Sequence, residues 1–372
     1  MQATIHVFNA SGNRLGIWES DQVGSVKRQM PFNGRQSIQF SVARPLATAA
    51  MCAFGNLVVI ESDTGAELWG GVIRGRRSWK LEGPTIPVQS WEAFLQAANT
   101  PTSAVYRGLN AGQIASRLLV DMQERYKFPI VVGDITNAGR TVDKEYRLES
   151  IYSAITRLQA DATSSLRLSR SRTIASTLAA NYKQGDSTLP STAQGEGFDW
   201  WIETTWDTWQ SHPVGVFHLE PRAGRDTGIL LTEGGNVADV NSVEDDERAV
   251  TSVTMLGSGG ENYNERPIIT ENDPDLLDEL QWSRETTEIR NDIRDTEALR
   301  AAARGILSAP KRNLTVGITN DGGEWAAIRN GDTVTTNLPS FEFGAAERKQ
   351  RVVGRSIDEH KGIQTLQLVA ED

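Results

Sequence analysis

The sequence predicts an α+β protein, mainly β, in which two small β-barrels flank an α/β insertion. Short runs rich in Val, Ile and Thr lie between turn residues, and the 372-residue chain contains 33 glycines. The periodicity becomes helical after Thr100 and returns to a strand pattern at Phe198. Because a domain has about 100 to 200 residues, this length predicts two or three domains.

Residues 1–97 are predicted to form the first β-barrel. From Gln36 to Ala43, "QSIQFSVA" alternates polar and apolar residues. The runs "GNLVVIES" and "LWGGVIRG" follow, separated by the turn-like "DTGAE", which is the pattern of an antiparallel hairpin. The segment "TIPVQSW" closes this unit near Trp91.

Residues 98–197 are predicted to form the α/β insertion. An amphipathic helix carries Ile114, Leu118 and Met122 at steps of four, with Asn110 as its N-cap and Gln113 as the capping-box partner. A second helix, "LESIYSAITRLQADA", follows the buried strand "FPIVVGDI". A loop or linker, "QGDSTLPSTAQGEG", completes the insertion.

Residues 198–372 are predicted to form the second β-barrel, with an added helical segment at about 273–309. The strand pattern returns in "FDWWIETT", "VGVFHLEP" and "TGILLT". Asp273 is the expected N-cap of the first added helix, with Pro274 at its first position. Pro310 ends the second added helix, and the chain finishes in strands such as "IQTLQLVA".

An internal similarity links the two β-units. "GNLVV" from Gly55 precedes "VIRGRRSWKLEGPTIPVQS", and "GDTVT" from Gly331 precedes "VVGRSIDEHKGIQTLQLVA". In each copy, a strand that begins with glycine is followed by a returning strand that carries arginine. After another glycine comes a last strand in which polar and apolar residues alternate. The identity is weak, but a true repeat would mean two related barrels in one chain.

Four of the ten tryptophans lie within thirteen residues, "FDWWIETTWDTWQ". Trp200 is expected in the core of a hairpin that opens the second β-unit, facing Val214 and Val216 on the returning strand. Trp206 and Trp209 fall in the connection between the strands, where an exposed aromatic side chain marks a contact surface. They are the candidate protein-contact residues.

Composition restricts the classes of function. The net charge is −10 and the sequence pI is about 5.1, so the surface as a whole repels phosphate backbones; the basic "RGRRSWK" is interpreted as the solvated face of a strand. The single cysteine, Cys52, excludes an internal disulfide and Cys-based zinc sites. No signal peptide and no apolar run of membrane-spanning length is expected.

No residue stands out as catalytic, cofactor-binding or metal-ligating. The four histidines, His6, His212, His218 and His360, lack metal-ligand spacing. "GDS" at Gly185–Ser187 resembles a hydrolase motif but lacks the strand-to-helix turn that activates a serine. The expectation is a protein without enzymatic activity and without a cofactor.

The order of elements resembles the baseplate-hub or tail-tip hub proteins of tailed bacteriophages, called minor tail proteins or tail-associated proteins in siphophages. The resemblance rests on "LWGGVIRG", the central "PRAGRDTGILLTEGGNVADVNSVEDDERAVTSVTMLGSG", and the terminal "NGDTV" with "RVVGRSIDEHKGIQTLQLVAED". The resemblance covers nearly the whole chain. It consists of the order of the secondary-structure elements and of short turn sequences, and includes no catalytic signature. Because the chain stops at Asp372, after the last predicted strand, it is expected to be a hub without a fused lysin.

The resemblance implies a virion protein of the tail tip, made in the host cytoplasm. It implies a homotrimer in which each chain supplies two barrels akin to the tail-tube protein, matching a six-fold tube to a three-fold tip, with DNA in transit through the lumen. Implied partners are the distal tail or tail-tube protein, the tape-measure protein, and tip, fibre or receptor-binding proteins, without stable membrane association. Two alternatives stay open: a carbohydrate-binding tip protein that stacks sugars on the tryptophans, and a peptidoglycan hydrolase.

Overall fold

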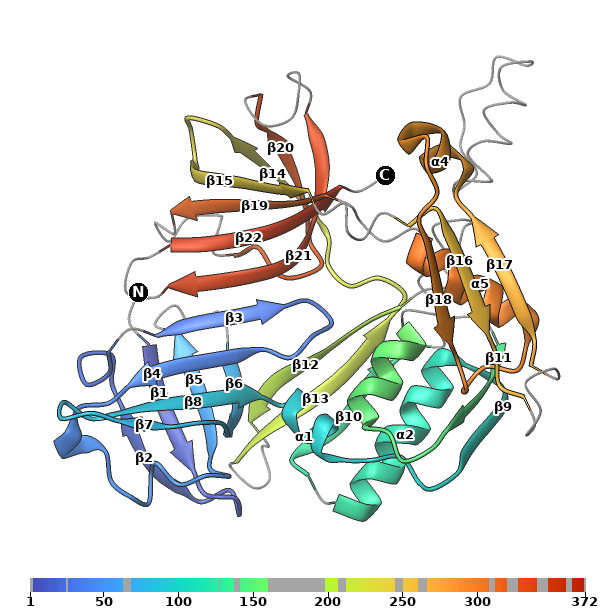
Figure 1. Ribbon diagram of the computed structural model, residues 1–372. Coiled ribbons are helices and arrows are strands. Elements are labelled where there is room, and N and C mark those ends of the chain that lie inside the picture. The colour runs from blue at the N-terminus through green and yellow to red at the C-terminus, as the bar shows by residue number, and fades with distance from the viewer. Residues whose placement is uncertain are drawn as a thin grey trace.

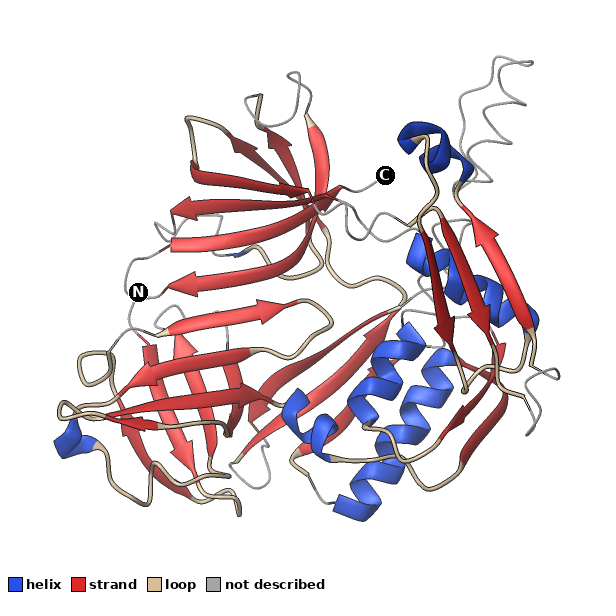
Figure 2. Ribbon diagram, in the orientation of Figure 1, coloured by secondary structure: helices blue, strands red, loops and turns tan. Residues whose placement is uncertain are grey.

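The computed structural model is mainly β, with a few helices beside several antiparallel sheets (Figures 1 and 2). Its strands form one large sheet and three small ones. The structure describes residues 3–24, 26–62, 68–126, 128–136, 141–159, 198–206, 212–244, 250–259, 266–307, 312–319, 327–339, 347–358 and 363–370.

The N-terminal β-unit contains the first eight strands and a short 3-10 helix. Alternation places its apolar residues inward, as in β8, where every second side chain is buried. Its elements are β1 (Ala3–Phe8), β2 (Arg14–Trp18), β3 (Lys27–Pro31), β4 (Ser37–Ser41), η1 (Arg44–Leu46), β5 (Leu57–Ser62), β6 (Leu68–Ile73), β7 (Ser78–Trp79) and β8 (Pro84–Ser90).

The C-terminal β-unit contains six strands, and it shares one sheet of 14 strands with the N-terminal β-unit. The sheet path is β15-β19-β22-β21-β3-β4-β8-β6-β5-β1-β2, with β20 between β14 and β21 and with β7 on β8. The strands of this unit are β14 (Asp226–Thr232), β15 (Val237–Glu244), β19 (Arg312–Thr319), β20 (Thr333–Asn337), β21 (Arg348–Asp358) and β22 (Ile363–Ala370).

The expected closed barrels are not found, because the described strands follow an open path from β15 to β2. The long strand β21 explains how the path continues from one unit to the other. Its first half pairs with β20, and its second half, from Gly354 to Asp358, pairs antiparallel with β3. One strand therefore belongs to the C-terminal β-unit and also carries the sheet into the N-terminal one (Figure 1).

The two β-units repeat the same strand order. In chain order, the strands of the N-terminal copy are β3, β4, β5, β6 and β8, and those of the C-terminal copy are β15, β19, β20, β21 and β22. The spatial orders, β3-β4-β8-β6-β5 and β15-β19-β22-β21-β20, are the same permutation, and every pairing within each copy is antiparallel. The repeat suggested by weak sequence similarity is thus present in the topology.

The same turn leads into the third strand of each copy. Gly55 and Gly331 have φ of +86° and +90°, values that favour glycine. Gly55 N donates to Ile73 O, and Ile73 N donates to the next carbonyl, that of Asn56. Gly331 N donates to Val352 O, and Val352 N donates to the carbonyl that follows Gly331. The two glycines therefore occupy equivalent positions.

The helical unit lies beside the N-terminal β-unit. Its main helix begins with the predicted capping box: Asn110 Oδ1 accepts from Gln113 N at 2.9 Å, and Asn110 N donates to Gln113 Oε1 at 3.1 Å. The elements are α1 (Glu92–Ala97), β9 (Ala104–Asn110), α2 (Ala111–Tyr126), β10 (Ile130–Ile135), β11 (Thr141–Tyr146) and a helix over 151–159.

The tryptophan-rich hairpin belongs to this helical unit. Strand β12 (Asp199–Trp206) pairs with β13 (Pro213–Glu220), and β13 pairs in parallel with β10. The expectation that the hairpin opens the second β-unit is therefore wrong. The expected register is also wrong by one residue, because Trp200 lies opposite Leu219 and stacks on Phe217 at 5.6 Å, whereas Val214 and Val216 lie opposite Thr205 and Glu203.

In the last small unit, a helix packs against one face of a three-stranded sheet. It contains β16 (Ser252–Leu256), β17 (Ile268–Asn272), α4 (Pro274–Leu280), β18 (Glu285–Ile289) and α5 (Thr296–Leu307). The expected cap is confirmed, because Asp273 Oδ1 accepts from Leu276 N at 3.0 Å. Leu299 and Ala303 of α5 are buried in its core.

Candidate functional site: the junction of the units

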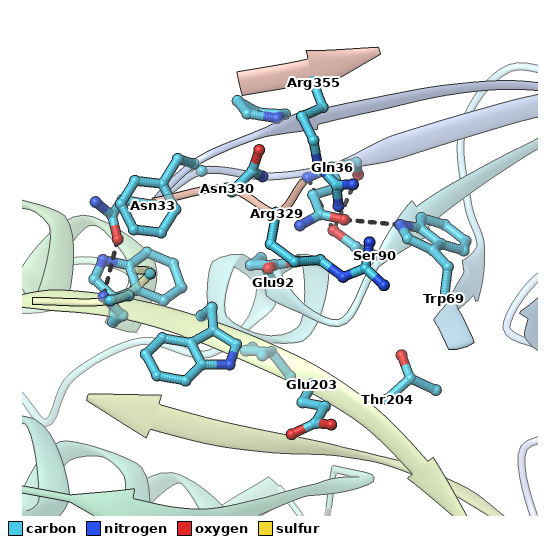
Figure 3. Close-up of a pocket in the computed structure, with 18 of the residues that line it drawn as sticks. Asn33, Gln36, Trp69, Ser90, Glu92, Glu203, Thr204, Arg329, Asn330 and Arg355 are labelled. Atoms are coloured by element: carbon cyan, nitrogen blue, oxygen red, sulfur yellow. Dashed lines mark hydrogen bonds between the residues drawn. The ribbon is translucent and has the colours of Figure 1, made fainter. Parts of the chain in front are cut away.

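A cavity of about 820 Å³ lies where three units meet (Figure 3). In that view, Arg355 and Asn330 come from the C-terminal β-unit at the top, Glu203 and Thr204 from β12 at the bottom, and Trp69 from β6 at the right. Its walls carry acidic, basic and aromatic side chains together.

Asp199, the first residue of β12, ties the three units together. Its Oδ2 accepts from Arg351 Nη2 at 2.5 Å and from Ala223 N at 2.9 Å, and its Oδ1 accepts from Asn33 Nδ2 at 3.2 Å. Asn33 in turn accepts from Trp200 N at 2.9 Å. This carboxylate is buried and accepts hydrogen bonds from both charged and neutral donors, so it fixes strand β12 against both β-units.

The backbone on the far side of this carboxylate is tightly packed. A Cβ on Gly224 would lie 2.1 Å from the carbonyl carbon of Gly331, so no larger residue fits there. Asp332 accepts from Arg225 N at 2.9 Å and from Arg329 N at 2.7 Å. The turn that the repeat shares with Gly55 therefore also forms part of the inter-unit contact.

Trp91 joins the N-terminal β-unit to the β12–β13 hairpin. Its indole Nε1 donates to Thr204 Oγ1 at 2.9 Å. A Cβ on Gly70 or on Gly215 would come within 2.7 Å of the indole, so both glycines leave room for it between strands β6 and β13. Gly70 of "LWGGVIRG" thus serves packing at this junction.

Glu92 is a buried carboxylate at the start of α1, in the wall of the cavity. Burial raises the pKa of Glu92 to about 7, although hydrogen bonds from Ser90 and from its own backbone act in the opposite direction. Its Oε2 is buried without a hydrogen-bond partner among the described residues. This carboxyl therefore takes up a proton near neutral pH.

A second buried polar cluster joins the helical unit to the last small unit. Asp292 lies 3.5 Å from Lys144 Nζ and 3.0 Å from Arg290 Nη2, and Arg157 Nη1 lies 3.6 Å away. Burial alone would raise the pKa of Asp292, but the hydrogen bond from Arg290 and the three positive charges outweigh it and lower the pKa to about 2. The ionised carboxylate thus connects two units.

Trp206 does not lie in the loop where the sequence placed it. It ends strand β12, opposite Pro213, and its ring packs edge-on against His6 and Phe8 of β1, each at 5.7 Å. Trp209 and the Gly185–Ser187 segment lie outside the described residues. Sequence reasoning did not nominate Asp199, Glu92 or Asp292, because isolated acidic residues give no signal until the fold brings their partners together.

Within the described part of the chain, no group of three or more His, Cys, Asp or Glu side chains is placed to hold a metal ion. In the same residues, no helix has both the length and the apolar character that a membrane crossing requires. His218 stacks on Trp201 at 5.1 Å and lies 3.4 Å from Glu203, on the face of the hairpin opposite Trp200. The geometry at the junction is that of a packed interface between units.

No protein-family model matches the sequence, and a search of curated proteins finds no match either. Solved structures do match over the whole chain. A 43 kDa tail protein of prophage MuSo2 from Shewanella oneidensis is 12% identical, with 99% of this chain and 98% of that chain covered and a TM-score of 0.59.

Two further structures give the same result. A tail protein from Neisseria meningitidis is 12% identical, covers 100% of this chain and 97% of its own, and has a TM-score of 0.60. A prophage tail protein from Listeria monocytogenes is 13% identical, with 99% and 95% covered and a TM-score of 0.55. The chain therefore has the fold of phage and prophage tail proteins, which confirms at the level of fold the resemblance found in the sequence.

Proposed function

We propose that this protein is a structural hub at the tip or baseplate of a phage-type tail, and that it has no enzymatic activity. The observation that carries the proposal is the duplicated strand block, joined into one sheet within a chain that matches tail proteins from end to end. An adaptor between symmetries needs two similar surfaces held in a fixed relation, and this duplication supplies them.

In this proposal three copies form a ring in which the six β-units resemble tail-tube subunits. The ring matches a six-fold tube above to a three-fold tip below, and DNA passes through its lumen. The neighbours are the distal tail or tail-tube protein, the tape-measure protein, and tip, fibre or receptor-binding proteins. The net charge of −10 supports passage of DNA without adhesion, because an acidic wall repels phosphate.

The buried polar junctions support a structural role. Asp199 and Asp292 each link two or more units through buried hydrogen bonds and ion pairs. Because buried charges are costly unless their geometry is kept, these links hold the units in one arrangement. A rigid arrangement of β-units is what a ring with fixed symmetry requires.

The ring is tested by measuring the mass of the purified chain by light scattering, alone and after mixing with the tail-tube protein of the same tail, and by imaging the mixture. Trimers or closed rings are expected. Monomers in both conditions would refute the ring.

Trp206 and Trp209 remain candidate contacts with a neighbouring protein. The double substitution Trp206→Ala with Trp209→Ala is predicted to weaken assembly while the chain stays folded. Since Trp206 packs on His6 and Phe8, the single change Trp206→Ala serves as the control for stability. Unchanged assembly of the double variant, measured by light scattering, would remove these residues from the interface.

A further inference from the structure

Among the described residues, four strands of the large sheet, β2, β7, β14 and β15, pair on one side only, and two of them, β7 and β15, end one continuous ladder. The strands β15, β19, β22, β21, β3, β4, β8 and β7 follow one another down the left side of Figure 1. Here β15 pairs only with β19, apart from an isolated bridge between Val237 and Glu233, and β7 pairs only with β8. The ladder therefore ends in an unpaired edge at each end, and such an edge is a template for another strand.

The repeat aligns this ladder residue by residue. In the N-terminal copy, Arg28 of β3 lies opposite Ile38 of β4. Ile38 lies opposite Val88 of β8, and Val88 lies opposite Ile73 of β6. In the C-terminal copy, Ser242 of β15 lies opposite Leu314 of β19. Leu314 lies opposite Leu368 of β22, and Leu368 lies opposite Val352 of β21. The equivalent pairs are Arg28 with Ser242, Ile38 with Leu314, Val88 with Leu368, and Ile73 with Val352.

The alignment continues to the strand at the edge of each copy. Ser78 lies opposite Thr85, and its counterpart Ser356 lies opposite Thr365. Trp79 accordingly corresponds to Ile357. The strand β7 is therefore the N-terminal copy of the second half of β21, the part that carries the sheet from one unit to the other.

Burial differs sharply between these equivalent positions. Ile357 is 6% exposed because β3 lies beside it, with Arg28 directly opposite. Trp79 is 58% exposed, since the described residues place no strand beside β7. A large apolar side chain is thus uncovered at the position where its counterpart is covered by a neighbouring strand.

We infer that β7 of one copy pairs antiparallel with β15 of a second copy, which repeats the β21–β3 junction between molecules. The junction inside the chain sets the register: Ile357 lies opposite Arg28, and Ser356 lies opposite Gln29. Transferred through the repeat, Trp79 faces Ser242 of the second copy and Ser78 faces Val243. The contact joins two different edges, so it is heterologous and propagates into a ring when the rotation closes. This inference rests on the ring proposed above.

Charge favours the same register. Lys80 falls opposite Asn241, and it lies diagonal to the exposed Asp239. Opposite charges on diagonal positions of an antiparallel pair are attractive. The basic "RGRRSWK" stretch, which the sequence alone assigned to a solvated strand, thereby gains an acidic neighbour at Lys80.

The β7 edge is held rigidly. Lys80 and Gly83 exchange two backbone hydrogen bonds of 3.1 and 3.2 Å, and Arg44 N donates to Glu82 O at 2.9 Å. A Cβ on Gly83, whose φ is +143°, would lie 1.9 Å from Val42 O, so the turn requires glycine. Because this edge is ordered before contact, little conformational entropy is lost when a strand adds to it.

The test is a disulfide between copies. A chain carrying Ser78→Cys and Val243→Cys is oxidised and run on a non-reducing gel, because facing residues of an antiparallel pair are about 4.5 to 5.5 Å apart at Cα, within disulfide reach. Covalent dimers and trimers are expected. The matched control pairs Ser78→Cys with Ala238→Cys, which the register places about five residues away, and should cross-link at least tenfold less. Native Cys52 is buried, so the unsubstituted chain serves as background.

A second variant tests the contact without cysteines. Trp79→Glu changes an exposed residue, so its melting temperature should stay the same while its self-association weakens at least tenfold. Equal cross-linking of the two cysteine pairs, a trimer without the Ser78–Val243 link, or unchanged association of Trp79→Glu would overturn the β7–β15 contact. A trimer lacking the link would leave the proposed function standing. A chain that stays monomeric even with the tail-tube protein would refute both.

Discussion

Two buried carboxylates, Asp292 and Glu92, are shifted in opposite directions. Asp292 is surrounded by Lys144, Arg290 and Arg157, and its pKa is lowered to about 2. Glu92 has one oxygen without a partner among the described residues, and burial raises its pKa to about 7. Burial penalises the charge at both sites, so the neighbours decide the sign. The contrast separates a carboxylate that links units from one that weakens the fold at neutral pH.

The largest effect is expected from Asp292→Ala. It leaves the positive charges of Lys144 and Arg290 buried without the carboxylate that balances them, so the free energy of unfolding should fall by about 3–5 kcal/mol. Denaturant unfolding at pH 7 measures this. Asp278→Ala, on the exposed side of α4, is the control and should change stability by less than about 0.5 kcal/mol. Equal losses would show that the cluster does not stabilise the junction.

Glu92→Gln should act in the opposite direction. The folded-state pKa of Glu92 lies above its ordinary value of 4.5, so the wild type is most stable below that value and loses stability as the pH rises through about 7. The amide cannot ionise, and the variant should gain up to about 3 kcal/mol over the wild type at pH 8. Unfolding at pH 5 and at pH 8 gives the comparison, and a gain of equal size at both would contradict the assignment.

Part of the fall in the free energy of unfolding at acid pH should come from protonation of Asp292. Its folded-state pKa of about 2 lies below the ordinary 3.8, so its contribution is present above pH 3.8 and is lost as the pH falls through 2. The contribution amounts to about 2 kcal/mol. Asp292→Asn should lack this part of the pH dependence. An identical acid limb in the variant and the wild type would assign the titration to other groups.

The smallest effect is expected from an exposed pair beside the β21–β3 junction. Lys27 Nζ lies 4.0 Å from Asp358, and the lysine side chain is 65% exposed. Lys27→Ala should cost less than about 1 kcal/mol, since water screens such pairs. A loss as large as that of Asp292→Ala would mean that this junction depends on the ion pair more than on its backbone pairing.

Local signals predicted local structure well. The capping box of Asn110 and Gln113 and the cap at Asp273 form as predicted, because each depends on residues within one turn of helix. The sequence also indicated the repeat, since Gly55 and Gly331 mark positions of positive φ that the chain needs in both copies. The resemblance to tail proteins depended on this order of elements.

Long-range pairing was beyond the sequence. The hairpin of Trp200 joins β10 and not the C-terminal β-unit, and its register differs by one residue from the expected one. Apolar alternation shows that a strand is half-buried, but both faces of β13 carry apolar side chains, so alternation could not fix the register. The junction residue Asp199 carried no sequence signal, because its partners Asn33 and Arg351 are far away in the chain.

By itself the sequence determined the mainly β class and the N-terminal caps of two helices, and it indicated the duplication, because these follow from spacing and turn chemistry over short distances. Only the tertiary structure decided that the two β-units share one open sheet through β21 and β3, and that β7 and β15 each have one edge without a partner strand among the described residues. The physical reason is that strand partners are chosen by hydrogen bonding and burial across the whole molecule. The exposure of Trp79 and the burial of Ile357 follow from that choice at two positions that the repeat makes equivalent.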